Sequence, residues 1–176
     1  MRHLLALALA ALVASPALAQ DKPAAKAPTA VMTLENGGVI TFEFFPADAP
    51  KHVENFLKLA REGFYDGQRF HRVEPGFVVQ IGDPQSKTLP MNAPGMGSGG
   101  PGYTIRAEFN NRKFERGILG MARSRDPDSA GSQFYIMLGT AEHLNGQYTA
   151  FGRVVGGMDV VDKIKVGDRV KSVKVN

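Results

Sequence analysis

Short apolar segments separated by turns rich in glycine and proline constrain the fold of this chain more than any other feature. Residues 31–35 and 39–45 flank Asn36-Gly37-Gly38, a typical hairpin turn. An apolar strand pair follows within 69–84, and further strand-like segments are 117–122, 132–138, 148–155 and 169–176. These segments do not alternate regularly with helices. The sequence therefore predicts a mostly antiparallel barrel rather than a parallel α/β sheet.

Two other segments have the periodicity of helices. In "DAPKHVENFLKLAREG", apolar residues recur at intervals of three and four between Val53 and Ala60. Asp48 is the expected N-cap of this helix and Gly63 its expected end. "GMDVVDKIKVG", residues 157–167, predicts a second, shorter helix. Each has one apolar face, so we expect both helices to cap the barrel.

The N-terminal segment 1–19 has the pattern of a bacterial secretory signal: a basic start, an apolar stretch from Leu4 to Val13, and small residues at its end. The apolar stretch is short for the alternative, a membrane anchor. We expect cleavage after Ala19, a disordered tether over 20–30 and a folded domain over 31–176. The mature protein is then expected in the periplasm, outside the membrane, with release from the cell as the alternative.

Composition narrows the function classes. The chain has 176 residues, enough for one domain with a sizeable core. It contains no cysteine, which excludes disulfides, thiol nucleophiles and thiolate metal ligands. The four histidines are not spaced as metal ligands, so we expect no metal site. With a net charge of +4 and no basic stripe, nucleic acid is not an expected partner.

Two motif matches are better explained as loops. "GMGSGG", residues 95–100, fits a dinucleotide-binding pattern by letter, but Pro101-Gly102 follows where that pattern needs a helix. We interpret it as a flexible loop. "DPDSAG", residues 126–131, resembles the start of a calcium loop, but Ala130 stands where a ligand is required. An ordinary Asp/Ser/Gly turn is the preferred interpretation.

Arg72 is the residue that a simple apolar core does not explain. It stands in "RFHRVEPGFVVQIGDP" (69–84), and Gln80 follows on the neighbouring predicted strand. In "SQFYIML", alternation with period two puts Gln133 and Tyr135 on one face. Two strands therefore present amides beside large apolar side chains. A surface arginine with its stem on apolar residues is the ordinary alternative, but the two amides favour a shared groove.

Several segments together resemble the cyclophilin family of peptidyl-prolyl isomerases. They are "FHRVEPGFVVQIGDP", "GGPGYTIRAEF", "RGILGMARSRDPDSAGSQFYI" and "YTAFGRVVGGMDVVDKI". The resemblance covers nearly the whole chain from about residue 31 onward. It implies a mainly β fold, a closed eight-stranded antiparallel barrel capped by two α-helices. It also implies catalysed rotation about X-Pro bonds in peptides and unfolded protein clients, without metal or cofactor, by a monomer.

The resemblance also assigns roles to individual residues. Arg72 would be the catalytic arginine. Gln80 and Gln133 would hold it and the substrate carbonyl. The proline pocket would be lined by Phe77, Val78, Tyr135 and Leu144; the substrate backbone would meet Ala122 and Arg123; and the rim would carry His143 and Tyr148.

This sequence departs from the family pattern at several of these positions. His143 stands where cyclosporin-sensitive relatives carry tryptophan, so weak cyclosporin binding is expected. Tyr135 replaces a phenylalanine found in many members and would place a hydroxyl deep in the pocket. Arg123 replaces an asparagine, and Tyr148 replaces a histidine of many eukaryotic members. The loop 83–103 is longer than in compact members.

Two other function classes remain as alternatives. A binding module or chaperone could hold proline-containing segments without turnover, although a pure binder has little need of Arg72. A hydrolase would need Ser132 as its nucleophile, and the sequence shows no local pattern for a supporting base.

Overall fold

The computed structural model describes residues 27–176, in which eight strands and two α-helices occur. The strands are β1 (Thr29–Leu34), β2 (Val39–Phe44), β3 (Arg72–Glu74), β4 (Val78–Ile81), β5 (Ile118–Met121), β6 (Phe134–Met137), β7 (Ala150–Gly156) and β8 (Val170–Val175). The helices are α1 (Pro50–Arg61) and α2 (Met158–Val161), with short 3-10 helices at Pro84–Lys87, Pro127–Ser129 and Glu142–Leu144. The predicted signal segment lies outside the described residues. β1 begins at Thr29, so it includes the last two residues of the predicted tether.

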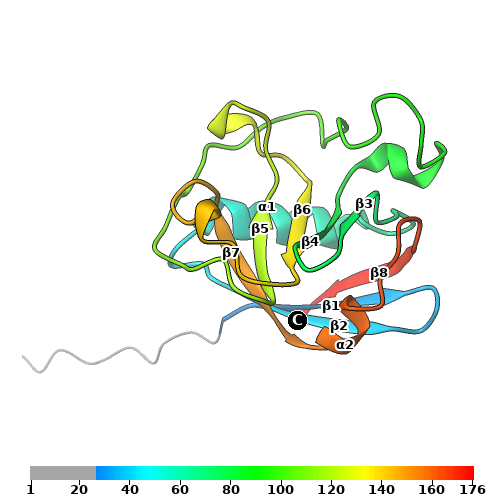
Figure 1. Cartoon of the computed structure of the whole chain (residues 1–176), viewed down its shortest axis with the longest axis horizontal. Coiled ribbons are helices and arrows are strands. Elements are labelled where there is room, and N and C mark those ends of the chain that lie inside the picture. The colour runs from blue at the N-terminus through cyan, green and yellow to red at the C-terminus, as the bar shows by residue number, and fades with distance from the viewer. Residues whose placement is uncertain (1–26) are drawn as a thin grey trace, which may run out of the picture.

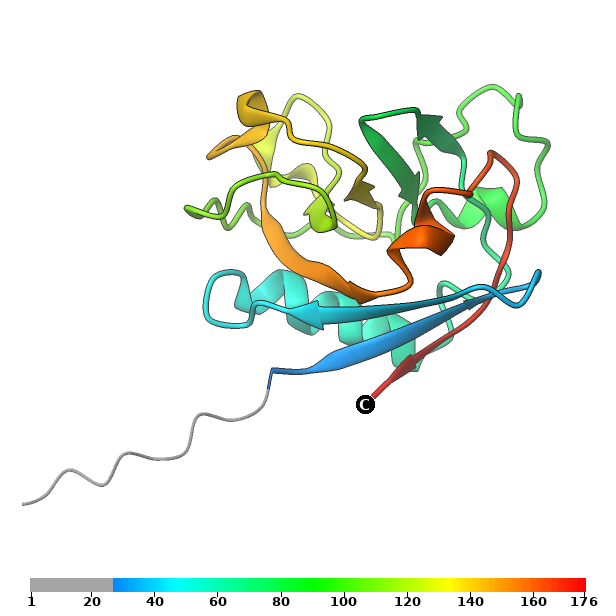
Figure 2. The ribbon, with the colours of Figure 1, turned by 60° about the horizontal axis from the view of Figure 1, so that its bottom comes forward.

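The eight strands form one antiparallel sheet with the order β3-β4-β6-β5-β7-β2-β1-β8. The sheet curls into a half-barrel, with β1 and β2 across its lower side and the C-terminal strand β8 ending beside β1 (Figures 1 and 2). The expected closed barrel is not confirmed, since β3 and β8 are the two ends of this order. One isolated antiparallel bridge joins Arg69, which precedes β3, to Arg169, which precedes β8.

Helix α1 carries the predicted apolar face, but its N-terminus is capped differently from the prediction. Asp48 makes no capping bond; its carboxylate instead accepts from Arg112, at 2.7 Å from Nη2. The free backbone N–H groups of Lys51 and His52 donate to the carboxylate of Glu108, 3.1 and 3.0 Å away. Glu108, which is distant in the sequence, therefore accepts the hydrogen bonds that an N-cap side chain would accept. Local sequence motifs give no indication of this contact.

Helix α2 is shorter than the predicted 157–167, because it ends at Val161. The backbone then tightens, with the N–H of Ile164 donating to the carbonyl of Val161. The Asp168 carboxylate accepts from the N–H of Lys165 at 2.9 Å. These bonds turn the chain toward β8 instead of continuing the helix. No helix among the described residues is long and apolar enough to cross a membrane.

Alternation along the strands separates two buried clusters on the two faces of the sheet. The main core contains α1 and the residues of β4 and β6 that face it, Val79, Ile81, Phe134 and Ile136. At its centre, Phe56 of α1 contacts the ring of Phe134 at 5.3 Å between centroids. The smaller cluster, on the other face, contains Val78, Phe114, Tyr135, Met137, Ala141, Leu144 and Ala150. The site described below lies on this second face.

The pair formed by His52 and Glu108 should make stability depend on pH. Burial lowers the pKa of His52 from its ordinary 6.5, although Glu108 opposes this shift. The pKa of Glu108 is also lowered, because hydrogen bonds from His52 and Lys51 outweigh the opposing effect of burial. The ionised carboxylate is an acceptor only, so Nδ1–H of His52 donates to it over 2.7 Å. Between about pH 6.5 and the lower pKa of the folded state, the unfolded chain therefore binds a proton at this histidine that the folded chain does not.

We expect the free energy of unfolding to decrease as the pH is lowered from about 7.5 to about 5.5. It should decrease further at lower pH, where Glu108 becomes protonated at a pKa below its ordinary value. Urea unfolding at these pH values tests this. The variant His52→Gln should show a weaker pH dependence, with a remainder from His71, whose pKa burial also lowers. The exposed His143→Gln is the control and should keep the wild-type dependence. An equal pH dependence in His52→Gln and the wild type would contradict the prediction.

Candidate active site

The register of the sheet places the functional side chains in one row. Arg72 of β3 pairs with Gln80 of β4, Gln80 with Tyr135 of β6, and Tyr135 with Gly120 of β5. Neighbouring strands lie about 4.8 Å apart, and paired residues point to the same face. A Cβ at Gly120 would lie 2.3 Å from Tyr135 Cζ, so the glycine lets the ring of Tyr135 lie flat on β5.

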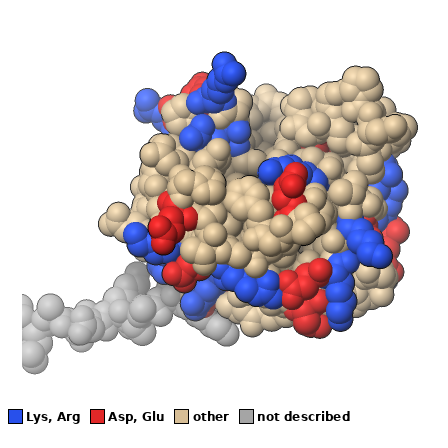
Figure 3. All heavy atoms as spheres, in the orientation of Figure 1, with Lys and Arg blue, Asp and Glu red and all other residues tan. Residues whose placement is uncertain are grey.

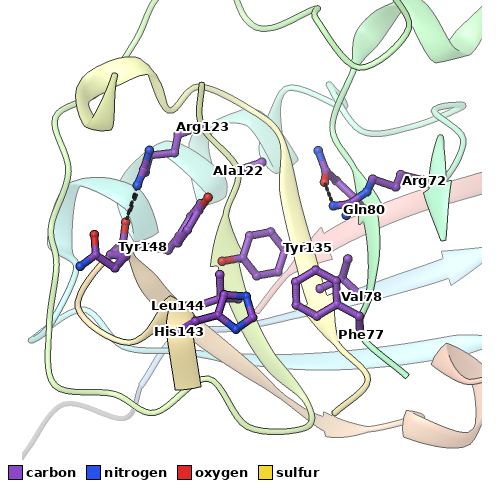
Figure 4. Close-up of a pocket in the computed structure, with 11 residues that line it drawn as sticks. Arg72, Phe77, Val78, Gln80, Ala122, Arg123, Tyr135, His143, Leu144 and Tyr148 are labelled. Atoms are coloured by element: carbon purple, nitrogen blue, oxygen red, sulfur yellow. Dashed lines mark hydrogen bonds between the residues drawn. The ribbon is translucent and has the colours of Figure 1, made fainter. Parts of the chain in front are cut away.

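This row forms the floor of a pocket of about 550 Å³ on the second face of the sheet (Figure 4). The lining residues are Arg72, Phe77, Val78, Gln80, Ala122, Arg123, Tyr135, His143, Leu144, Gln147 and Tyr148. All of them except Gln147 were predicted from the sequence. Their roles in binding and catalysis stay predictions. The volume of this pocket lies within the usual range for small-molecule binding sites.

Arg72 lies at one end of the pocket, between a polar and an apolar neighbour. Its Nη1 donates to Gln80 Oε1 at 3.2 Å, and its Nε is 3.6 Å from a carboxylate oxygen of Glu74. Its guanidinium carbon is 5.8 Å from the ring centre of Phe77. The side chain is 43% exposed, so it keeps unused N–H groups that a bound molecule can meet.

Gln133 is the one predicted site residue that does not line this pocket. Its Oε1 accepts from Gln80 Nε2 at 3.0 Å, and its own amide group faces the glycine-rich loop. Gln133 therefore reaches Arg72 only through Gln80, and its predicted role in holding Arg72 stays a prediction. Its N–H groups both donate to loop carbonyls, which leaves none for a substrate carbonyl.

The rim of the pocket is built from two stacked pairs. The guanidinium of Arg123 lies 4.4 Å from the ring centre of Tyr148 and donates to the carbonyl of Gln147 at 3.0 Å. On the opposite side, His143 stacks on Phe77 with 5.9 Å between ring centres. Figure 4 shows these pairs on either side of Tyr135. The rim thus combines flat rings with hydrogen-bond donors, which suits an extended peptide.

The hydroxyl of Tyr135 is buried at the pocket floor and has no hydrogen-bond partner among the described residues. Burial raises the pKa of this phenol, so it stays protonated. Its ring contacts Phe114 and Tyr148, with 6.1 Å between centres in both pairs. The sequence prediction of a hydroxyl deep in the pocket agrees with this placement.

Removing this hydroxyl in Tyr135→Phe should stabilise the protein by up to about 1 kcal/mol, because a buried hydroxyl without a partner costs about 1–3 kcal/mol. Urea unfolding measures the change. Tyr148→Phe is the matched control, since that ring is only half-buried, and its stability should change little. A loss of stability in Tyr135→Phe would mean that its hydroxyl has a partner in solution.

Three segments considered in the sequence analysis have structural roles. The glycine-rich segment is a loop, in which the N–H groups of Gly97 and Gly99 donate to Asp83 and the carbonyl of Gly97 accepts from Gln133. In "DPDSAG", Asp126 accepts from the N–H of Asp128 in a 3-10 turn. Ser132 is buried and donates to the carbonyl of Gly82 at 2.6 Å, which leaves it unsuited to nucleophilic attack. The described residues contain no group of acids and histidines able to hold a metal.

Sequence reasoning missed Asp83, His71 and Gln147. Asp83 is fully buried and lies two residues after the end of β4, where its carboxylate accepts hydrogen bonds from the loop that follows. His71 precedes Arg72, and both of its ring nitrogens are buried without a partner among residues 27–176. The run of glycines from Gly95 to Gly100 is the one sequence signal of a backbone that passes close to an acceptor.

The face that carries the pocket is mostly uncharged, and charges of both signs mingle along its lower edge (Figure 3). No acidic residue lines the pocket, and its two guanidinium groups stand at opposite ends. The arrangement joins an apolar hollow, hydrogen-bond donors and a flat rim. No serine, threonine, aspartate or glutamate lines the pocket, and the chemistry it favours is binding and distortion of a neutral, partly apolar chain.

An antiparallel half-barrel with an arginine beside an apolar pocket is consistent with an enzyme that binds peptides. The family model described as cyclophilin type peptidyl-prolyl cis-trans isomerase/CLD matches residues 29–176. The chain belongs to this family and is a cyclophilin-type peptidyl-prolyl cis-trans isomerase.

Relatives and solved structures agree. A probable peptidyl-prolyl cis-trans isomerase of Brucella abortus (strain 2308) is 46% identical over 172 residues, which are 95% of this chain and 87% of the relative. Peptidyl-prolyl cis-trans isomerase B of Bacillus subtilis (strain 168) is 46% identical over 149 residues, 84% of this chain and 97% of that protein. A Cryptosporidium parvum cyclophilin type isomerase has a TM-score of 0.73 and 28% identity over 85% of this chain and 98% of its own. A structure of that protein obtained in the presence of the dipeptide Ala-Pro has a TM-score of 0.72.

Proposed function

We propose that Arg72 catalyses rotation about X-Pro bonds by stabilising the twisted amide. Amide resonance gives these bonds a barrier of about 18–20 kcal/mol. At the twisted transition state the resonance is lost, and the proline nitrogen gains a lone pair. A guanidinium donor near that nitrogen binds the twisted state better than the planar one, which is the condition for catalysis. The observation that carries the proposal is the place of Arg72, half-exposed and directed by Gln80 beside the apolar wall of Phe77.

The apolar pocket would supply the rest of the acceleration. A hydrogen bond from a charged group contributes about 1.5–3 kcal/mol, so Arg72 alone cannot account for a large rate enhancement. A proline ring between Val78, Tyr135 and Leu144 would be held in a dry environment that weakens amide resonance. The Ala-Pro dipeptide named for the Cryptosporidium protein supports a proline ligand here as well.

The test is cis-trans exchange of a short Ala-Pro-Phe peptide, measured by NMR with the protein and with Arg72→Ala. Exchange that is fast with the wild type and slow with the variant supports the role of Arg72. The alternative, a binding module without turnover, predicts chemical-shift changes in the peptide with no faster exchange in either protein.

We also propose that cyclosporin binds weakly. His143 is exposed at the rim and stacked on Phe77, where sensitive family members present the larger indole of tryptophan. His143→Trp should therefore bind cyclosporin at least about tenfold more tightly than the wild type, a difference of about 1.4 kcal/mol. Isothermal titration calorimetry measures both. A tight complex with the wild-type protein would overturn the proposal.

The cellular role we propose is assistance to protein folding in the periplasm, by a monomer cleaved after Ala19. The basic, apolar and small-residue pattern of residues 1–19 supports export. Uncatalysed isomerisation takes about 10–100 s, long enough to limit the folding of proline-containing clients. Mass spectrometry of protein from the periplasmic fraction and from the medium would locate the mature chain and its first residue. Light scattering would determine its oligomeric state.

A further inference from the structure

The loop after β4 is tied to a buried carboxylate. Asp83 is fully buried, and its Oδ2 accepts from the N–H groups of Gly97 and Gly99, at 2.6 and 3.3 Å. Its Oδ1 accepts from the N–H of Gln85 at 2.8 Å. A Cβ at Gly99 would lie 2.2 Å from Asp83 Oδ1, so only glycine allows the backbone this close. By contrast, a Cβ at Gly100 would meet no atom within 4 Å.

The carbonyls of Gly97 and Gly99 point away from Asp83, toward Gln133. Gln133 Nε2 donates to the carbonyls of Gly97 and Gly99, each at 2.8 Å. A primary amide has two N–H groups, and both are used here. If the amide of Gln133 were flipped, its oxygen would face two carbonyl oxygens. The glycine carbonyls therefore determine the orientation of this amide, with Oε1 directed away from the loop.

This orientation continues to the guanidinium of Arg72. Gln133 Oε1 can only accept, so Gln80 must direct its Nε2 toward it, over 3.0 Å. Gln80 Oε1 then faces the opposite side, where it accepts from Arg72 Nη1 at 3.2 Å. Reversing either amide would place donor against donor at one of these contacts. Each of these hydrogen bonds is therefore donated in the same direction, from Arg72 to Gln80, from Gln80 to Gln133, and from Gln133 to the loop carbonyls.

We propose that Asp83 and the carbonyls of Gly97 and Gly99 position Arg72 through the amides of Gln133 and Gln80. This inference rests on the catalytic role of Arg72 proposed above. Asp83 touches no part of the pocket and acts only through these groups, so it is a positioning residue. A displaced loop would release the Gln133 amide, and with it the acceptor that directs Arg72.

The test compares Gly99→Ala with Gly100→Ala, the same substitution one residue apart. Gly99→Ala should lower kcat by about tenfold, since small displacements in an active site have effects of this order, and should leave the dissociation constant of the peptide nearly unchanged. Gly100→Ala should match the wild type in both. The ¹H–¹⁵N signals of the Gln80 and Gln133 side-chain amides and of Arg72 Nε should shift in Gly99→Ala only. A purely structural effect on stability would not move kcat apart from the dissociation constant.

Asp83→Asn is a second, isosteric variant that keeps the volume of the buried side chain. Its amide group would have to face one of the backbone N–H donors, so at least one loop contact is lost, and kcat should fall in the same way. On an Arg72→Ala background, neither Gly99→Ala nor Asp83→Asn should lower turnover much further, because their effect passes through Arg72.

Wild-type turnover in both loop variants would overturn the positioning role, provided that Arg72→Ala is slow. The positioning role would also be overturned if the loop variants lowered turnover by the same factor on the wild-type and on the Arg72→Ala background. Undiminished turnover in Arg72→Ala itself would instead overturn the catalytic role of Arg72, which is a different result from the same set of proteins.

Discussion

Arg72→Ala should turn over an Ala-Pro-Phe peptide about tenfold to a hundredfold more slowly than the wild type, the loss expected when one hydrogen bond from a charged group, about 1.5–3 kcal/mol, is removed from the transition state. Binding should survive, because the apolar wall of Phe77, Val78, Tyr135 and Leu144 does not depend on the guanidinium. NMR exchange spectroscopy gives the rate, and a titration of the peptide chemical shifts gives the affinity. A large loss of turnover with little loss of peptide affinity indicates transition-state stabilisation, whereas equal losses indicate simple binding.

Two controls make this result specific. Arg153→Ala removes an arginine that pairs with Glu43, at 2.6 Å, and lines no part of the pocket, so turnover should be unchanged. Arg72→Lys keeps the charge but loses the planar fork, and its turnover should lie between those of Arg72→Ala and the wild type. Equal turnover in Arg72→Ala and the wild type would refute the assignment of Arg72.

Phe56→Ala should be the most destabilising single substitution of this set, with a loss of about 3–5 kcal/mol. Its side chain is 1% exposed and contacts the rings of Phe42, Phe44, Tyr65, Phe134 and Phe151. This residue joins α1 to the curled sheet, so its removal leaves a cavity that neither element can fill alone. Urea unfolding followed by circular dichroism measures the loss.

Phe109→Ala is the matched control, because Phe109 is 44% exposed and its removal leaves no cavity. Its stability should lie within about 0.5 kcal/mol of the wild type, as is usual for surface positions. A loss below about 1 kcal/mol in Phe56→Ala would mean that the core around α1 collapses to fill the space.

Local patterns in the sequence were enough to predict the faces of individual strands and of α1. Alternation in residues 132–138 separated Tyr135, at the pocket floor, from Phe134 and Ile136 in the main core. This worked because successive side chains of a strand point to opposite faces. The spacing from Val53 to Ala60 likewise identified the buried face of α1. The resemblance to cyclophilins then named ten of the pocket residues before any geometry was known.

Local patterns were misleading where a distant group satisfied the backbone. Asp48 has the sequence of an N-cap, but Glu108 accepts the N–H groups at the start of α1. The sequence of the glycine-rich loop does not show its partners, but the N–H of Gly97 donates to Asp83 and its carbonyl accepts from Gln133. The second helix ends early at Val161, because later residues bond to one another in tight turns.

The sequence by itself determined the antiparallel strands and the apolar faces, since both depend on residue types at short, regular spacings, and the resemblance of its longer motifs identified the family. The tertiary structure alone decided three other features: which carboxylate caps α1, how the amides of Gln80 and Gln133 are oriented, and that β3 and β8 end the sheet without pairing with each other. Each of these depends on groups that are far apart in the chain and meet only after the sheet has curled. Hydrogen bonds are directional, and most buried donors and acceptors pair with whichever group the fold brings within reach.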